Sequence, residues 1–507
     1  RMAARQRAAA RPKVQVREQG RVSIFAVVGF LAVGVFAALV LMSTAAVAEI
    51  GTADAPVPVS ILIKDVSPDD ADTIAVVDAI EKGMAAQGNY VDITILEAPA
   101  GTYVEVVPLA FRTGEINPDI IFFQGNTDTP VVAEGLLEDL TSYVEGSTYV
   151  KNLMGEHSKA RMASSPYLLW LAPAKFSAPV IRGDFLDQAP SKDAFLADPT
   201  PEAYATLLKE LMDAGVVKFG TTVDGGLARL DSIFNHAFGV TGTLMQQEDG
   251  KYVYSMVTEQ EKNKLAFYAQ LYADGILDAD YITKAWDTME QAFYEGDCAM
   301  IAGTAGDVIQ VYNTKMVQTM GEDAELVALP PAKGIGQAFQ SIDVTKEERG
   351  FAINATIEQN VKDAAFAILD YMASPEGRMI DKLGVEGVHY TVEDGVITFT
   401  DAWGGYWARF FPTVDGLPED LKLATPVLST PAADSLALGA EYYYNDVNVI
   451  IPDELQPQLA AVTSIYTEYA NEIVRGVRPV DDFAEMVEKF NAAGGDALTE
   501  YVNSVLQ

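Results

Sequence analysis

The chain has 507 residues, and its 72 acidic side chains outnumber 35 Lys and Arg for a formal net charge of −37. The charge is uneven, because residues 1–48 hold seven basic side chains and one acid, so 71 of the acids lie in residues 49–507. This acidic body lacks the basic surface that a phosphate backbone requires, which argues against binding to nucleic acid.

The few cysteine and histidine residues restrict the chemistry further. Cys298 is the single cysteine, so an intrachain disulfide and a CxxC redox pair are excluded, and we expect it to pack as a small core residue. His157, His236 and His389 are far apart in sequence and have no HExxH or HxH spacing. We therefore expect neither a metal nor a cofactor.

An apolar segment follows a basic leader at residues 1–21. Residues 22–48 carry no charge and contain a run of nineteen almost entirely apolar residues, about the length that crosses a bilayer as a helix. The basic leader predicts that the amino terminus stays in the cytoplasm and that the body is exported to the cell surface. Residues 49–56 then serve as a tether.

Two alternatives to a membrane anchor remain at this segment. The pattern Ala46-Val47-Ala48 also suits signal-peptidase cleavage, which would release a secreted protein, although cleaved signals usually have a shorter apolar core of about 7–15 residues. The apolar helix could instead pack with copies of itself in a surface filament or array. Sequence does not separate membrane insertion from self-association.

The body begins with alternating strand and helix patterns. Short β-branched or apolar runs alternate with stretches of helical periodicity at residues 57–63, 71–88, 91–98, 103–112, 118–123 and 131–144. This order predicts an α/β fold with a parallel sheet and crossover helices, whose ligands bind at the carboxyl ends of strands.

Later segments continue the mixture of helix and strand. Amphipathic helices are predicted at 200–215, 258–275 and 360–377, and short buried strands at 299–304 and 350–355. Two further helices close the chain. No period of 20–50 residues recurs, which excludes a solenoid or a propeller.

These motifs together resemble a known family. The ordered marks are PDIIFF (118–123), AEGLLEDLTSYV (133–144), VIRGDFLDQ (180–188), TPEAYATLLKELMDAG (200–215), LYADGILDADY (271–281), AFYEGDCAMIAGTAG (292–306), the run at 350–380, LGVEGVHYTVEDGVITF (383–399) and the run at 471–498. In this order and spacing the chain resembles the extracellular solute-binding proteins of ABC importers, family 1, especially the lipoprotein-type branch that binds oligosaccharides. It departs from that branch in lacking the lipid-bearing Cys. It also lacks the aspartate-rich calcium loop of some alginate-binding relatives near 215–231.

The resemblance implies a type II periplasmic-binding-protein fold with two α/β lobes that close around a ligand. By the family pattern, lobe 1 comprises residues 57–165 and 341–400, and lobe 2 comprises 166–340 and 401–507. The implied function is a non-enzymatic receptor that captures a sugar or oligosaccharide and presents it to ABC permease subunits.

Candidate ligand-binding residues follow from the chemistry of sugars, which bind flat aromatic faces and planar polar groups. The aromatic candidates are Trp170, Trp286, Trp403, Tyr406 and Trp407, with Arg409 beside the last two. For any single tryptophan a core position is an equal alternative, but Gly404 and Gly405 favour a cleft position for the cluster at 403–407.

The polar candidates mostly follow predicted strands. They are Gln124, Asn126, Asp128, Asp231, Asn235, Thr304, Asp307 and Tyr390. Ordinary alternatives are helix capping for the first three and a solvated helix face for Asp231 and Asn235. A structural histidine is the alternative at His389–Tyr390, and we expect Arg182 and Asp184 to form a structural salt bridge. A polysaccharide lyase or hydrolase is the enzymatic rival, which no motif supports.

Overall fold

The computed structural model describes residues 50–124, 129–171, 175–340, 349–403, 409–411, 417–444, 446–447, 449 and 451–506. Residues 49–507 form one compact unit. The predicted apolar helix at 22–48 lies outside the described residues. Within the described ranges, no helix combines the length and the apolar character needed to cross a membrane.

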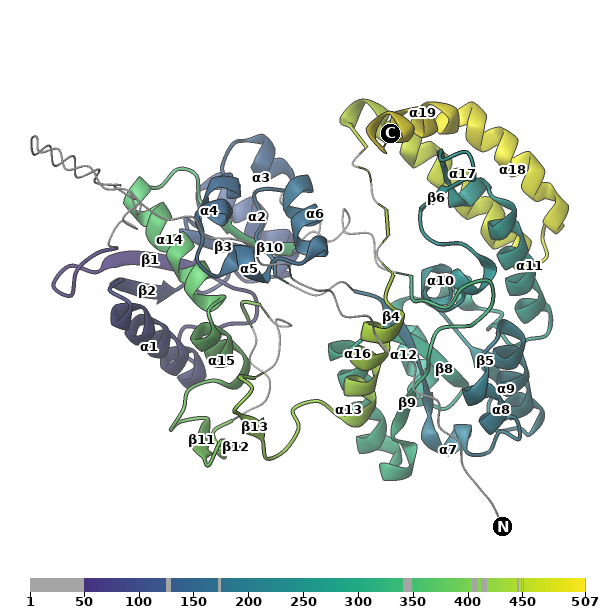
Figure 1. Cartoon of the computed structure of the whole chain (residues 1–507), viewed down its shortest axis with the longest axis horizontal. Coiled ribbons are helices and arrows are strands. Elements are labelled where there is room, and N and C mark those ends of the chain that lie inside the picture. Colours follow the sequence, from purple (N-terminus) through teal and green to yellow (C-terminus); the bar gives the residue numbers. More distant parts are fainter. Residues whose placement is uncertain are drawn as a thin grey trace, which may run out of the picture. The chain divides into compact units, whose positions relative to one another are not determined.

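The first sheet has the strand order β10-β3-β1-β2, and we call the part of the chain around it lobe 1 (Figure 1). Its first three strands in the chain run parallel and the last is antiparallel. Their bounds are β1 (Val57–Leu62), β2 (Val91–Ile95), β3 (Ile120–Gln124) and β10 (Arg349–Ile353). The predicted strands at 57–63, 91–98, 118–123 and 350–355 are thus confirmed.

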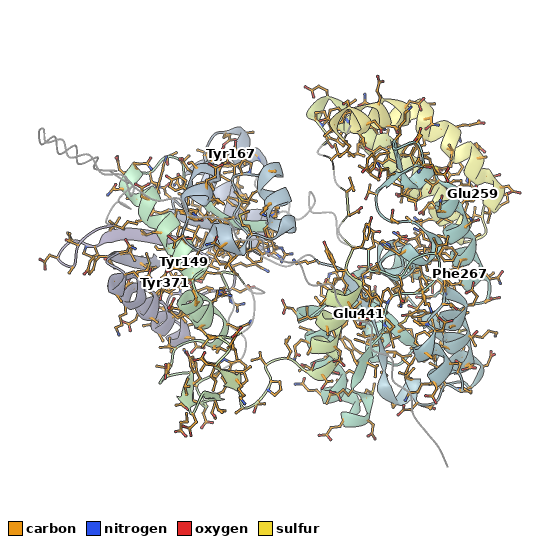
Figure 2. All side chains as sticks on the ribbon, in the orientation of Figure 1. Tyr149, Tyr167, Glu259, Phe267, Tyr371 and Glu441 are labelled. Carbon is orange, nitrogen blue, oxygen red and sulfur yellow. The ribbon has the colours of Figure 1, made fainter. Side chains whose placement is uncertain are left out.

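Apolar residues cover both faces of this sheet. Successive residues of β3 alternate between two cores, since Phe122 lies in one and Phe123 in the other. Such double burial explains why the strands are almost continuously apolar. The first core includes residues of α1 (Ala71–Ala86) and α14 (Gln359–Met372), and the second includes residues of α2 (Tyr103–Thr113). In Figure 2, Tyr371 marks the first core and Tyr149 packs against it.

Two predicted helices of lobe 1 are broken in the structure. The segment 131–144 forms α3 (Thr129–Ala133) and α4 (Thr141–Gly146), because Gly135 turns with φ 71° and Leu137 bridges to Asn354. The segment 360–377 forms α14 and then α15 (Pro375–Leu383), since the Ser374 hydroxyl accepts a hydrogen bond from the Gly377 N–H and starts a new helix. Helical periodicity continues across both breaks, so it did not reveal them.

The second sheet has the order β5-β8-β4-β9, and we call the part of the chain around it lobe 2. Strand β4 runs antiparallel to its neighbours β8 and β9, while β5 is parallel to β8. The strands are β4 (Ser177–Arg182), β5 (Phe219–Thr221), β8 (Cys298–Thr304) and β9 (Leu326–Ala328). Cys298 is buried in a core of this lobe, as predicted.

Helices surround this sheet on both faces. They are α7 (Gly183–Leu186), α8 (Lys192–Ala197), α9 (Pro201–Asp213), α10 (Ala228–Phe234), α11 (Glu259–Ala273), α12 (Trp286–Tyr294), α13 (Asp307–Met320) and α16 (Thr430–Tyr442). The carboxy-terminal helices α17 (Gln456–Val474), α18 (Phe483–Phe490) and α19 (Asp496–Leu506), yellow in Figure 1, share a core with α9 and α11. The predicted helices at 200–215 and 258–275 are confirmed as α9 and α11.

A small third sheet lies near the predicted lobe boundary at residue 400. It pairs β11 (Tyr390–Glu393), β12 (Val396–Phe399) and β13 (Lys422–Leu423). Phe410 and Phe411 belong to a core of lobe 1, where both rings meet Phe351 of β10. We therefore propose that the chain leaves lobe 1 after β13 and not at residue 400.

Candidate functional site

The carboxyl ends of three parallel strands meet at one edge of the lobe 1 sheet. Gln124 ends β3 there, at the carboxyl end of a strand as predicted, and is half-buried. Near it, the Tyr103 hydroxyl donates to the Phe122 carbonyl at 2.8 Å. Asp65 follows β1 with φ 59°, a conformation rare outside glycine. The edge thus presents amide, phenol and carboxylate groups. Asn126 and Asp128 lie outside the described residues.

The corresponding edge of lobe 2 carries Thr304 and Asp307. Thr304 ends β8, and Asp307 is the first residue of α13. The Gly306 N–H between them donates to the Ser435 hydroxyl at 2.9 Å, which ties this turn to α16. Asp307 is exposed, yet the surrounding protein desolvates its carboxyl enough to raise the pKa, against the opposing charge of Lys175.

Asp231 and Asn235 belong to a polar cluster around the buried side chain of Lys264. The ammonium of Lys264 lies 2.7 Å from Asp231 Oδ1 and 2.9 Å from Glu261 Oε2. It also donates to Asn235 Oδ1 at 2.6 Å. Burial alone would lower the pKa of Lys264, but the two carboxylates outweigh it and raise this pKa. Lys264 therefore stays charged inside the protein.

The same cluster shows that a solvated helix face is the wrong alternative for Asn235, which is buried. Asp231 is also engaged within the protein, since Tyr268 donates to its Oδ1 at 3.0 Å. Contact of these two residues with a ligand stays a prediction. Their observed bonds are to other protein side chains, which suits residues that position their neighbours.

Sequence analysis missed a polar set that continues outward from Asn235. The Asn235 amide donates to Gln340 Oε1 at 3.2 Å, and the Gln340 amide donates to Asp446 Oδ2 at 2.9 Å. His236 and Tyr444 lie next to this series of hydrogen bonds, and their ring centroids are 4.9 Å apart. These residues are up to about two hundred positions apart and share no motif. The pairing of Phe339 with Tyr443 brings them together.

The three described tryptophans have different environments. Trp170 is buried among Phe122 and Phe351, and its indole N–H has no hydrogen-bond partner in the described structure. Trp403 is half-buried and stacks on Phe399, with the two ring centroids 3.9 Å apart. Trp286 begins α12 and is 62% exposed. Of the three tryptophans in the described residues, only Trp286 presents most of its surface to solvent, and a ligand role stays a prediction for each.

The remaining candidates lie close to α15. Tyr390 is buried in the core of the small sheet. Its neighbour His389 is also buried; its Nδ1 accepts from the Val385 N–H at 2.8 Å, and its Nε2 lies 3.0 Å from Asp72. These contacts agree with a structural histidine. Tyr406 and Trp407 lie outside the described residues.

Buried Asp381 fixes the chain at Arg409. Its carboxylate accepts backbone N–H bonds of 2.8–2.9 Å from Arg409, Phe410 and Phe411. The side-chain role of Arg409 stays a prediction. In lobe 2, Arg182 and Asp184 form the predicted salt bridge, with contacts at 2.6 and 2.9 Å.

A family model decides the identity of this two-lobed chain. Residues 70–379, more than half of the chain, match the model described as bacterial extracellular solute-binding protein. The chain is a bacterial extracellular solute-binding protein. Lipoprotein LipO of Bacillus subtilis (strain 168) is 20% identical to it over 283 residues, 51% of this chain and 54% of LipO. The solute-binding protein therefore spans about half the length of this curated relative.

Solved structures share its fold across most of the chain. One is an HMO-binding solute-binding protein of Bifidobacterium longum infantis that is associated with an ABC transporter. The match covers 88% of this chain and 97% of that protein, with 14% sequence identity and a TM-score of 0.58. The N-glycan transport solute-binding protein NgtS of Streptococcus pneumoniae covers 87%, with 96% of its own chain matched, 15% identity and a TM-score of 0.58. At these identities the likeness establishes the fold.

Proposed function

We propose that this solute-binding protein captures a sugar or oligosaccharide between its two lobes and delivers it to an ABC permease. The observation that carries the proposal is the family match over residues 70–379. The solved structures named for HMO binding and for N-glycan transport support a carbohydrate as the solute class. The polar edges at Gln124 and at Thr304–Asp307 supply groups that suit hydroxyls.

Binding without catalysis follows from this proposal. Each lobe offers hydrogen-bonding groups at its strand ends, and closure around the ligand would stabilise the bound state. Residues 22–48 would hold the protein at the outer face of the membrane, where the acidic body meets extracellular solutes.

Calorimetric titration and thermal unfolding of the purified chain test the proposal. Both are measured with maltotriose, diacetylchitobiose, mannotriose, kestose and trigalacturonate, and with free amino acids and short peptides as the competing solute class. A bound sugar at one hundred times its Kd would add about 2.7 kcal/mol to the free energy of unfolding. Stabilisation by a peptide or an amino acid, and by no sugar, would reassign the solute class.

A further inference from the structure

The polar set around Gln340 has the composition of a sugar subsite. We propose that Tyr444, His236, Gln340 and Asp446 bind one uncharged sugar ring on lobe 2, and that buried Lys264 positions them through Asn235. This inference rests on the proposed function and assigns it a place and a ligand class. Three of its residues, Gln340, Tyr444 and Asp446, lie outside every sequence motif described above.

An aromatic surface is the first component. Tyr444 is 43% exposed, and the ring of His236 lies 4.9 Å away at an interplanar angle of 58°. A side chain supported in this way holds its phenol ring in one orientation while part of the ring stays in contact with solvent. The C–H face of a pyranose packs well on such a ring.

Two planar polar groups lie beside that ring. Gln340 accepts from Asn235 and donates to Asp446 Oδ2, which also accepts from the Thr243 N–H at 3.3 Å. These bonds fix the orientation of the amide and of the carboxylate. The Gln340 amide has a second N–H donor beyond the one bonded to Asp446, since an amide has two. Paired hydroxyls of a sugar match this arrangement.

A glycine makes the position of Asp446 possible. A Cβ on Gly242 would lie 1.7 Å from Asp446 Oδ1, so only glycine permits the carboxylate to approach the backbone this closely. Gly242 directly precedes Thr243, whose N–H binds the same carboxylate. Sequence and geometry therefore agree on a fixed carboxylate at this point.

His236 supplies an independent indication of a ligand. Its side chain is 96% buried, and Nε2 has no hydrogen-bond partner in the described structure. Burial lowers the pKa of His236 to about 4, so the imidazole is neutral at physiological pH. Buried polar atoms are nearly always paired, so this unpaired nitrogen shows that the polar set is incomplete without a further hydrogen-bonding group.

Lys264 acts as a positioning residue behind this surface. Its ammonium is buried and held by Asp231 and Glu261, and it donates to Asn235 Oδ1. That bond orients the Asn235 amide so that its N–H group faces Gln340. Each hydrogen bond in the series therefore runs in a fixed direction, from Lys264 to Asn235, from Asn235 to Gln340 and from Gln340 to Asp446.

Charge decides between neutral and acidic sugars. Asp446 brings a carboxylate to the subsite, and the positive charge of Lys264 is already matched by two carboxylates. A uronate or sulfate group at this position would meet repulsion that a hydroxyl does not. The subsite therefore suits a neutral ring.

Titration of wild-type and variant full-length chains with the sugar panel tests the subsite. Tyr444→Ala and Asp446→Asn should each weaken binding of the preferred neutral sugar about tenfold or more, because each removes a ligand contact. Val477→Ala, at a position 63% exposed, and Asp139→Asn, whose carboxylate accepts from the Thr141 N–H, are the matched controls. Both controls should bind as tightly as the wild type.

Asn235→Asp tests the positioning role. The aspartate can still accept from Lys264 but cannot donate to Gln340, so affinity should fall about tenfold. Circular dichroism should stay close to wild type, whereas the melting temperature should fall because the added carboxylate is buried beside Asp231 and Glu261. Restored binding in Asn235→Gln would indicate that the donor is what matters.

The outcomes separate the two proposals. If the wild type binds a neutral sugar and all three variants bind it equally well, the subsite is wrong and the proposed function stands. If trigalacturonate is the preferred ligand and depends on Asp446, the assignment to neutral rings is overturned. A wild type that binds no sugar overturns both.

Discussion

At the scale of single residues, His236 makes folding stability depend on pH. Its pKa is lowered by burial from 6.5 to about 4, so between these values the unfolded chain binds more protons than the folded one. Stability is therefore fully present above pH 6.5 and is lost as the pH falls toward 4. The loss from this residue is about 3 kcal/mol at most.

Urea unfolding of the wild type and His236→Gln at pH 7 and pH 4.5 measures this contribution. Carboxylates titrate in both proteins, so the difference between the two pH profiles isolates His236. We expect the wild type to lose more stability than the variant on acidification. Parallel profiles would show that the imidazole is accessible to protons in the folded state.

The residues that sequence could predict are those governed by local chemistry. Cys298 has no partner to pair with, and Arg182 lies two residues from Asp184, so a core position and a salt bridge follow directly. Gln340 and Asp446 are separated by 106 positions and meet only in the folded chain. No spacing rule reaches that far, which explains why the lobe 2 subsite was missed.

At the scale of elements, helix α16 depends on close packing against the start of β4. Gly439 faces the ring of Phe176, which stacks on Phe339 at 4.5 Å. A Cβ at Gly439 would lie 2.4 Å from the Phe176 ring, so Gly439→Ala must displace the helix or the ring. We expect a loss of about 2 kcal/mol in the free energy of unfolding.

Gly146→Ala is the matched control for this prediction. Gly146 is also helical, in α4, and no heavy atom lies within 4 Å of its added Cβ. The control should be neutral or stabilising by up to about 1 kcal/mol. Equal effects of the two substitutions would mean that α16 adapts without strain.

Strands were easier to predict than the ends of helices. The strands of lobe 1 are buried on both faces, so their apolar runs stand out from the polar sequence around them. Helix breaks at Gly135 and Ser374 depend on a left-handed turn and a side-chain cap, which leave the apolar period intact. Periodicity reports which face is buried, and it says little about where the helix axis changes.

At the scale of the whole molecule, the acidic body and the apolar segment should perform separate tasks. Residues 49–507 form a compact unit with their own cores, and every residue of the proposed subsite belongs to it. The uncharged residues 22–48 are long enough to enter a bilayer, whereas the body repels anionic lipid. Sugar binding and membrane attachment should therefore be separable by truncation.

The full chain and residues 49–507 are compared by sedimentation with vesicles of phosphatidylcholine and phosphatidylglycerol, and by titration with the preferred sugar. We expect only the full chain to sediment with vesicles, because an uncharged apolar segment of this length can enter a bilayer whereas the net negative charge of the body opposes binding to anionic lipid. Both proteins should bind the sugar with the same Kd within about twofold, because every residue of the proposed subsite lies in the body. A twofold change in Kd corresponds to about 0.4 kcal/mol of binding free energy. Sedimentation of the truncated body with vesicles would place a lipid-binding surface on the lobes. A change in sugar affinity on truncation would mean that the leader contributes to the ligand site.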